Sequence, residues 1–125
     1  MTSAIIDHAF REHPRECCGV ILGKDAHPTH VLEMENIAEG NRFYEIDPAQ
    51  LIELEFEILP NENLELLAIY HSHPESVAFP SATDIELAFW SEAVYLICSL
   101  ESPQHPYIRG FRIHDGGVVE VTLQS

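Results

Sequence analysis

Six short apolar runs, each bounded by turn residues, most strongly limit the folds that this chain can adopt. Runs of this length between such signals predict buried strands. They cover residues 17–23, 29–34, 64–70, 94–100, 107–113 and 118–123. The first two are predicted to pair as a hairpin, and so are the last two, which are joined by the turn sequence Asp115-Gly116-Gly117.

Helical patterns are interspersed with these runs. Residues 3–13 carry apolar side chains at helical spacing, and the predicted helix stops at His13 because a residue before proline avoids the helical region. A further helix start is predicted at residues 81–84, ahead of apolar residues in the segment 85–90. Strands and helices are therefore intermixed. In the first helix the apolar positions are Ile5, Ile6, Ala9 and Phe10.

The segment 48–59 carries two conflicting patterns. Its apolar residues alternate with Glu53, Glu55 and Glu57, as they would in a strand. Asp47 is a good helix cap, however, and a proline at position 48 suits the first helical turn. The sequence therefore predicts a helix here, and its apolar face would comprise Leu51, Ile52, Ile58 and Leu59.

Length and composition fit one globular domain that spans residues 1–125. The chain is 46% hydrophobic and 22% charged, which excludes a disordered or collagen-like protein. No apolar run approaches the roughly 18 residues of a membrane helix, and charged residues interrupt the N-terminus where a signal peptide would be apolar. These two features predict a cytoplasmic protein without a membrane partner. Because Cys17, Cys18 and Cys98 are odd in number and two are adjacent, we predict that their thiols are reduced.

The chain is strongly acidic. It has 6 basic and 21 acidic residues, a formal charge of −15, so a nucleic-acid partner is not expected. No Lys or Arg occurs between Arg42 and Arg109. Such a region would attract a metal ion or a basic peptide, although a solvated acidic surface that only maintains solubility is the more common explanation.

The third apolar run leads directly into His71-Ser72-His73-Pro74. Residues two apart on a strand share a face, so His71 and His73 can converge on one point, and Asp84 is a reasonable third ligand for catalytic zinc. A polar strand end would explain the two histidines as well. Ser81 and Asp84 also form a helix-capping pattern, which does not exclude a second role in a cleft.

The complete pattern resembles the JAB/MPN metalloprotease family. It consists of Glu16, then His71-Ser72-His73, seven residues, Ser81, two residues and Asp84. The segments HPRECCGVILG, FYEIDP, IYHSHPESVAFPSATD and YLICSL are similar to compact bacterial members. The resemblance implies an α/β fold, a single domain with a curved mixed β-sheet flanked by helices, similar to cytidine deaminase.

The same resemblance implies a zinc-dependent peptidase or isopeptidase. His71, His73 and Asp84 correspond to zinc ligands, Glu16 to the general base, and Ser81 to the serine that stabilises the oxyanion. The small bacterial relatives imply cleavage next to the C-terminal Gly-Gly tail of a ubiquitin-like or sulfur-carrier protein. Ubiquitin itself is a less suitable substrate, because the chain has no room for the insertions that bind it in eukaryotic members.

Two alternatives accompany this interpretation. One is a catalytically inactive metal-binding or protein-interaction module of the same fold, although inactive members typically lose ligands and this sequence has all of them. The other is a metal-independent cysteine hydrolase that uses Cys17 or Cys18 near His71. Cysteines in an apolar strand are more often simply buried.

Overall fold

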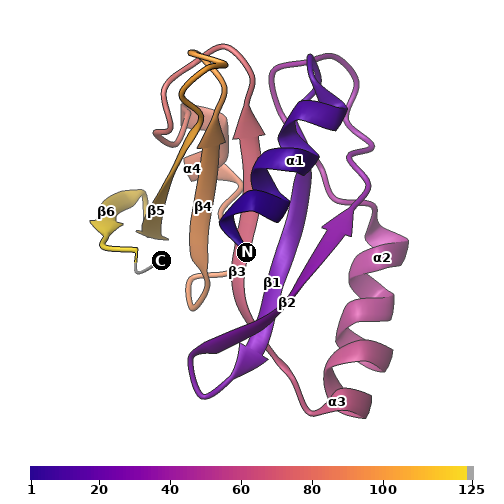
Figure 1. Ribbon diagram of the computed structural model, residues 1–125. Coiled ribbons are helices and arrows are strands. Elements are labelled where there is room, and N and C mark those ends of the chain that lie inside the picture. The colour runs from indigo at the N-terminus through magenta and orange to yellow at the C-terminus, as the bar shows by residue number, and fades with distance from the viewer. Residues whose placement is uncertain (124–125) are drawn as a thin grey trace.

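The computed structural model describes residues 1–123, which contain one six-stranded mixed sheet (Figure 1). The strand order is β2-β1-β3-β4-β5-β6, and β3 and β4 are parallel whereas the other neighbours are antiparallel. The strands are β1 (Cys18–Lys24), β2 (His27–Met34), β3 (Glu65–His73), β4 (Val94–Ser99), β5 (Tyr107–His114) and β6 (Gly117–Val121). The predicted α/β fold and both predicted hairpins are confirmed.

Helices cover both faces of the sheet (Figure 1). Helix α1 (Thr2–Glu12) lies across one face, and α4 (Ala82–Glu86) lies behind the sheet in the same view. The segment after Asp47 is helical throughout, with α2 (Pro48–Glu53), the π-helical turn η1 (Leu54–Ile58) and α3 (Leu59–Glu62). Within residues 1–123, no helix is both long and apolar enough to cross a membrane.

The sheet separates two hydrophobic clusters. Ile5 and Ala9 of α1 pack against residues that include Ala68 and Tyr70 of β3. Ile69, between them in sequence, belongs to the cluster on the opposite face, which also receives apolar side chains from the α2–α3 segment and α4. Because side chains alternate along a strand, the odd-numbered positions of β3, including 71 and 73, point away from α1.

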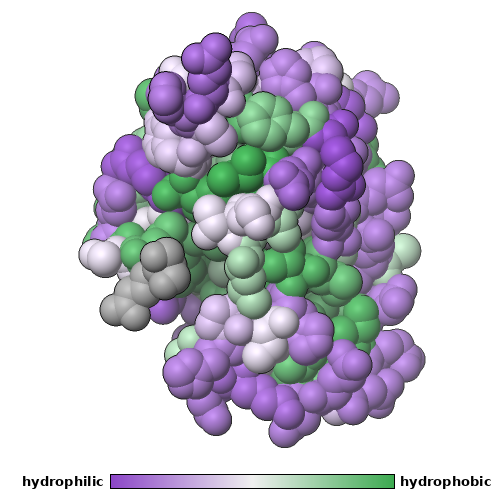
Figure 2. Space-filling model, viewed as in Figure 1, coloured by the Kyte–Doolittle hydropathy of each residue, from purple (hydrophilic) through white to green (hydrophobic). Residues whose placement is uncertain are grey.

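Helix α1 covers only part of its face. Figure 2 shows hydrophobic surface in the middle of this side of the molecule, with hydrophilic residues around it. The helix buries Ile5, Ala9 and His8, and the Nδ1 atom of His8 lies 2.7 Å from the Tyr70 hydroxyl. Phe10 was predicted on the apolar face but is 43% exposed, because a residue adjacent to Ala9 lies about 100° around the helix from it.

The helix prediction for residues 48–59 is confirmed, although it continues to Glu62. Asp47 caps the helix by accepting a hydrogen bond from the Ala49 amide at 2.9 Å. The predicted apolar face was wrong at Ile52, which is 59% exposed, whereas Leu54 is buried. The turn through Leu54 is π-helical, so the spacing of side chains around the helix departs from the α-helical period that the prediction assumed.

Two boundaries also differ from the prediction. Strand β3 continues through His73 instead of ending at residue 70, because β1 and β4 pair with it up to the histidines. Helix α4 ends at Glu86, so the apolar residues 87–90 are not helical. There the Trp90 amide donates a hydrogen bond to the Tyr95 hydroxyl, and Phe89 is 75% exposed.

Candidate metal site

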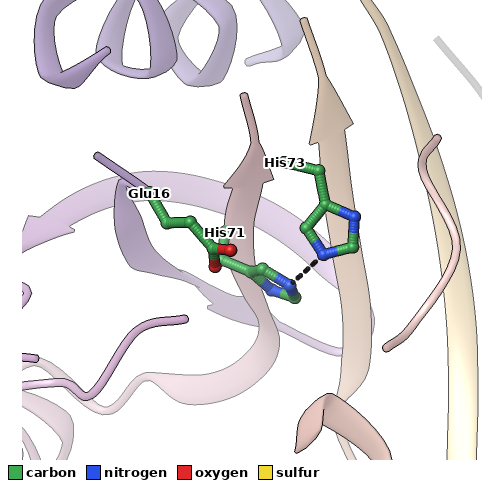
Figure 3. Close-up of side chains that lie close together, drawn as sticks. All are labelled: Glu16, His71 and His73. Carbon is green, nitrogen blue, oxygen red and sulfur yellow. Dashed lines mark hydrogen bonds between the residues drawn. The ribbon is translucent and has the colours of Figure 1, made fainter. Parts of the chain in front are cut away.

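Three ligand atoms converge at the end of β3. The Nε2 atoms of His71 and His73 lie 3.2 Å apart, and both rings are buried. Figure 3 marks this contact with a dashed line. The Oδ2 atom of Asp84, in the first turn of α4, lies 3.1 Å from Nε2 of His71 and 3.0 Å from Nε2 of His73. The two nitrogens and one carboxylate oxygen thus face a common point, and the strand spacing predicted this convergence for the two histidines.

This donor set fits a zinc ion. Ligand atoms held about 2.0 to 2.1 Å from a tetrahedral zinc lie about 3.3 Å from one another, close to the separations observed here. The two imidazole nitrogens are neutral acceptors when unprotonated, so a shared cation explains why they point together. Three protein ligands also leave a fourth position for water, as in catalytic zinc sites.

Glu16 is buried beside the histidines (Figure 3). One potential ligand atom from each of Glu16, His71 and His73 lies within 4.8 Å of the others. The Oε1 atom of Glu16 has no hydrogen-bond partner among residues 1–123. Burial raises the pKa of Glu16 to about 8, so its carboxylate holds a proton more tightly than an exposed one.

Hydrogen bonds between side chains and the backbone hold Glu16 next to β3. Ser72 points away from the two histidines, and its Oγ accepts a hydrogen bond from the Cys17 amide at 2.8 Å. On the other side, the Nδ2 atom of Asn36 donates to the Glu16 carbonyl at 2.9 Å. The residue between the histidines therefore fixes the backbone that carries the carboxylate.

The two histidine rings are oriented differently. Nδ1 of His73 lies 2.8 Å from the Val77 carbonyl, a contact that directs Nε2 toward the cluster. The ring of His71 is stacked on Tyr44, with centroids 4.4 Å apart and planes inclined by 24°. Nδ1 of His71 has no hydrogen-bond partner within the described residues. On its Nδ1 side, therefore, packing against Tyr44 takes the place of the hydrogen bond that His73 makes.

Burial and the shared carboxylate set the protonation of the cluster. Burial lowers the pKa of His71, which favours its neutral, ligating form. Burial also opposes charge on His73, but its hydrogen bonds to Asp84 and Val77 outweigh this and raise its pKa. For Asp84, burial works against ionisation, yet the contacts with both histidines hold its pKa well below the usual range. Asp84 is therefore ionised.

Ser81 and Asp84 form the predicted capping box at the start of α4. Oγ of Ser81 accepts a hydrogen bond from the Asp84 amide at 3.0 Å, and the Ser81 amide donates to Oδ2 of Asp84 at 2.9 Å. The same Oδ2 atom faces both histidines, so the cap also positions a ligand atom. Because Ser81 Oγ acts as acceptor in the cap, its hydroxyl hydrogen stays free to donate.

Two pockets flank the cluster. The first, here called the polar pocket, has lining residues that include Glu16, Asn41, Arg42, His73, Glu75 and Ser81. The second, here called the apolar pocket, has lining residues that include Phe43, Tyr44, Leu51, Asp84, Leu87 and Trp90. The cluster therefore has a hydrophilic approach on one side and a hydrophobic one on the other.

The sequence reasoning missed two residues that hold the site together. Asn36 is buried, and besides the Glu16 carbonyl its side chain binds the amides of Ala38 and Glu45 and the Phe43 carbonyl. Tyr44, which stacks on His71, was not singled out either. Both lie in or near the segment FYEIDP, whose likeness to bacterial relatives was the available signal for Tyr44. Asn36 had no comparable signal.

The cysteines are poorly suited to nucleophilic catalysis. Cys18 lies opposite His71 in the register of β1 and β3, but burial raises the pKa of its thiol to about 12. Burial likewise raises the pKa of Cys17 to about 12. A reactive cysteine needs a thiolate, so both thiols are inert near neutral pH.

Known proteins are similar to this chain in sequence and in fold. Residues 1–114 match the family model described as prokaryotic homologs of the JAB domain. A CysO-cysteine peptidase of Mycobacterium tuberculosis is 33% identical over 122 residues, which is 96% of this chain and 83% of that protein. A desampylase of Haloferax volcanii is 38% identical over 108 residues, or 77% of this chain and 73% of that protein. A solution structure of a protein from Desulfitobacterium hafniense superimposes with a TM-score of 0.84 at 30% identity, covering 96% of this chain and 84% of that one.

Proposed function

The chain belongs to the family of prokaryotic homologues of the JAB domain, and from this premise we propose that it is a zinc-dependent peptidase or isopeptidase. Its substrate is an amide bond next to the C-terminal tail of a ubiquitin-like or sulfur-carrier protein. The names of the relatives, a CysO-cysteine peptidase and a desampylase, support this reaction. The observation that carries it is the convergence of two histidine nitrogens and one carboxylate oxygen beside a buried glutamate.

His71, His73 and Asp84 are the proposed zinc ligands. Their three atoms approach one another to 3.0–3.2 Å. Among residues 1–123, Glu16 makes no hydrogen bond to either histidine, and its free Oε1 atom suits a role beside the metal. When bound, zinc would act as a Lewis acid toward the amide carbonyl and lower the pKa of a water molecule.

Glu16 is the proposed general base. It accepts a proton from the attacking water, whose oxygen forms a bond to the amide carbon, and it then delivers that proton to the leaving nitrogen as the carbon–nitrogen bond breaks. The new carboxylic acid then gives its proton to the released amine, so the products are a carboxylate on the tail and an ammonium group. Asn36 and Ser72 support this role because they fix the backbone on both sides of the Glu16 carbonyl.

Ser81 is the proposed oxyanion donor. Its Oγ accepts from the Asp84 amide, so its hydroxyl hydrogen is available to the carbonyl oxygen as negative charge develops there. A donor of this kind lowers the barrier by about 3 kcal/mol. Ser81 lines the polar pocket together with Glu16, which places the two groups on the same side of the cluster.

The remaining parts of the proposal follow from charge and thiol chemistry. The acidic surface, with a formal charge of −15, does not suit nucleic acid, so the partner is the substrate protein itself. Three free, buried thiols suit the reducing cytoplasm, which we propose as the location of the protein. Residues 1–125 act as a single JAB/MPN metalloprotease domain.

The first test measures metal and cleavage on the same samples. We expect about one zinc per chain, and cleavage of a ubiquitin-like protein that carries an extension after its Gly-Gly terminus. The variant His71→Ala/His73→Ala should lose both, because a catalytic site needs three protein ligands. His105→Ala/His114→Ala is the matched control, since these exposed histidines lie outside the cluster.

Each outcome of this test has a distinct meaning. Near-stoichiometric zinc in the folded His71→Ala/His73→Ala variant would show that the metal is held elsewhere. Zinc-loaded wild-type protein that leaves every such substrate intact would favour the inactive interaction module. Cleavage that survives complete removal of metal would point to a metal-independent hydrolase.

A further inference from the structure

Arg42 lies in the polar pocket together with Glu16, His73 and Ser81. It is the only Lys or Arg among the residues that line this pocket. The pocket has a volume of about 520 Å³, which is within the range of sites that bind small molecules. A positive charge thus stands beside the groups proposed to carry out hydrolysis.

The side chain of Arg42 is unpaired, unlike those of the other four arginines. Within residues 1–123 it makes no hydrogen bond or ion pair, and it is exposed to solvent. The other arginines each bind oxygen atoms of the protein: Arg11 binds Glu33, Arg15 the carbonyls of Asn36 and Ala38, Arg109 Glu120, and Arg112 the Glu92 carbonyl. Arg42 therefore has its whole guanidinium available for a ligand.

The charges around Arg42 bear on which ligand its unpaired guanidinium can bind. The chain has a net charge of −15 and no other Lys or Arg until Arg109. A ligand carboxylate approaching Glu75 and Asp84 would be repelled unless a cation offset them. The planar guanidinium binds a carboxylate through two parallel hydrogen bonds, which makes Arg42 suited to that group.

The position of Glu16 indicates which part of the substrate meets Arg42. The proposed base delivers its proton to the leaving nitrogen, so the pocket that it shares with Arg42 receives the leaving amine. In a departing α-amino acid, the α-carboxylate is only two covalent bonds from that nitrogen. In a lysine isopeptide, the α-carbon lies at the far end of a four-carbon side chain. Arg42, which lines the same pocket as Glu16, matches the first geometry.

We infer that Arg42 is a specificity residue that binds the free α-carboxylate of a single amino acid released from the substrate's C-terminus. This inference rests on the proposed function. According to this inference, the protein removes one terminal residue in preference to cleaving an isopeptide bond. The name of the mycobacterial relative, CysO-cysteine peptidase, is consistent with a substrate of this kind.

The test compares two forms of one substrate. A ubiquitin-like protein ending in Gly-Gly-Cys is prepared with a free C-terminal carboxylate and with a neutral C-terminal amide. For zinc-loaded wild-type enzyme, kcat/KM should be roughly 10- to 100-fold higher for the free acid, as expected for a charge-assisted pair. Arg42→Gln should remove most of this preference by lowering only the free-acid rate, and Arg42→Lys should restore part of it.

Lys24→Gln is the matched control, because it removes the same charge from an exposed side chain. Lys24 lies six residues along β1 from Cys18, which pairs with His71, a distance of about 20 Å at about 3.3 Å per residue. It should keep the wild-type preference. Equal wild-type rates for both forms, or an equal loss of both in Arg42→Gln, would overturn the inference while leaving the proposed function intact. Cleavage of neither form by wild type would overturn the proposed function itself.

Discussion

The polar and apolar pockets meet at the same cluster, yet their walls suit different tasks. The polar pocket contains the groups that can exchange a proton or donate a hydrogen bond, Glu16 and Ser81. The apolar pocket is lined mainly by apolar and aromatic side chains, including Tyr44, Leu87 and Trp90, which offer contact area, and Asp84 borders it from the cluster. Chemistry and substrate binding are thus separated across the metal site. Under the proposed function, we expect the leaving amine on the polar side and the tail segment before the scissile bond on the apolar side.

Glu16→Gln gives the sharpest test of the polar side. Removing a general base costs on the order of 100- to 10,000-fold, so single-turnover cleavage should fall by at least two orders of magnitude. Zinc content and tail binding should stay near wild type, because Gln keeps the hydrogen-bonding shape of the side chain. Metal analysis, a binding measurement and single-turnover kinetics on one sample check this.

Glu75→Gln serves as the control, because it makes the same chemical change in the same pocket. It should stay within a few-fold of wild type. If Glu75→Gln lost the activity and Glu16→Gln kept it, the assignment of the base would have to be reversed.

Trp90→Ala tests the apolar side and should have an intermediate effect. Loss of a hydrophobic contact worth about 1.5 kcal/mol or more should raise KM about 10-fold and leave kcat nearly unchanged, because the contact is the same in ground and transition states. The hydrogen bond to Tyr95 comes from the Trp90 backbone and survives the substitution. Steady-state kinetics separate the two parameters.

Phe10→Ala is the matched control for this change. Phe10 and Trp90 have similar exposure, 43% and 39%, but Phe10 lies on α1 on the opposite face of the sheet. A fall in kcat without a change in KM for Trp90→Ala would show that the apolar side takes part in the chemistry and would break the comparison.

The smallest effect is expected at the cysteines, which belong to neither pocket. Burial raises the pKa of both thiols to about 12, so both stay protonated at pH 8. Iodoacetamide at pH 8 should therefore leave Cys17 and Cys18 unmodified in the folded protein, as mass spectrometry would show. Cys18→Ala, if folded and zinc-loaded, should cleave within about two-fold of wild type. Full inactivation of such a variant would instead support a cysteine nucleophile.

The parts of the fold and site that the sequence predicted depend on short-range signals. The strand runs, the helix cap at Asp47 and the capping box at Ser81 each involve residues within a few positions of one another. The histidine pair is also local, because strand geometry alone places alternate residues on one face. Such features need no knowledge of what lies across the fold.

The parts that were missed depend on long-range packing. Ile52 and Leu54 are both apolar, and only the local π-helical geometry and the position of the sheet decide which one is buried. The Asn36 side chain donates to the Glu16 carbonyl, and the two residues are twenty positions apart in sequence. In the sequence alone, nothing distinguishes Asn36 from an asparagine on the surface. Residues 87–90 have the composition of a helix. The hydrogen bond from the Trp90 amide to the Tyr95 hydroxyl, however, holds this segment in a non-helical conformation.

The loop between Asn36 and Ile46 has a consequence for how this enzyme could be altered. Its two ends are joined by an isolated β-bridge between these residues, and the Asn36 side chain ties its interior together. It has the length and closed base of an Ω-loop. Arg42 faces the polar pocket from it, and Phe43 and Tyr44 face the apolar pocket. Grafting a different sequence onto residues 39–43, with Tyr44 kept against His71, would therefore exchange both halves of substrate selection at once, while Glu16, the histidines and Asp84 stayed on the scaffold.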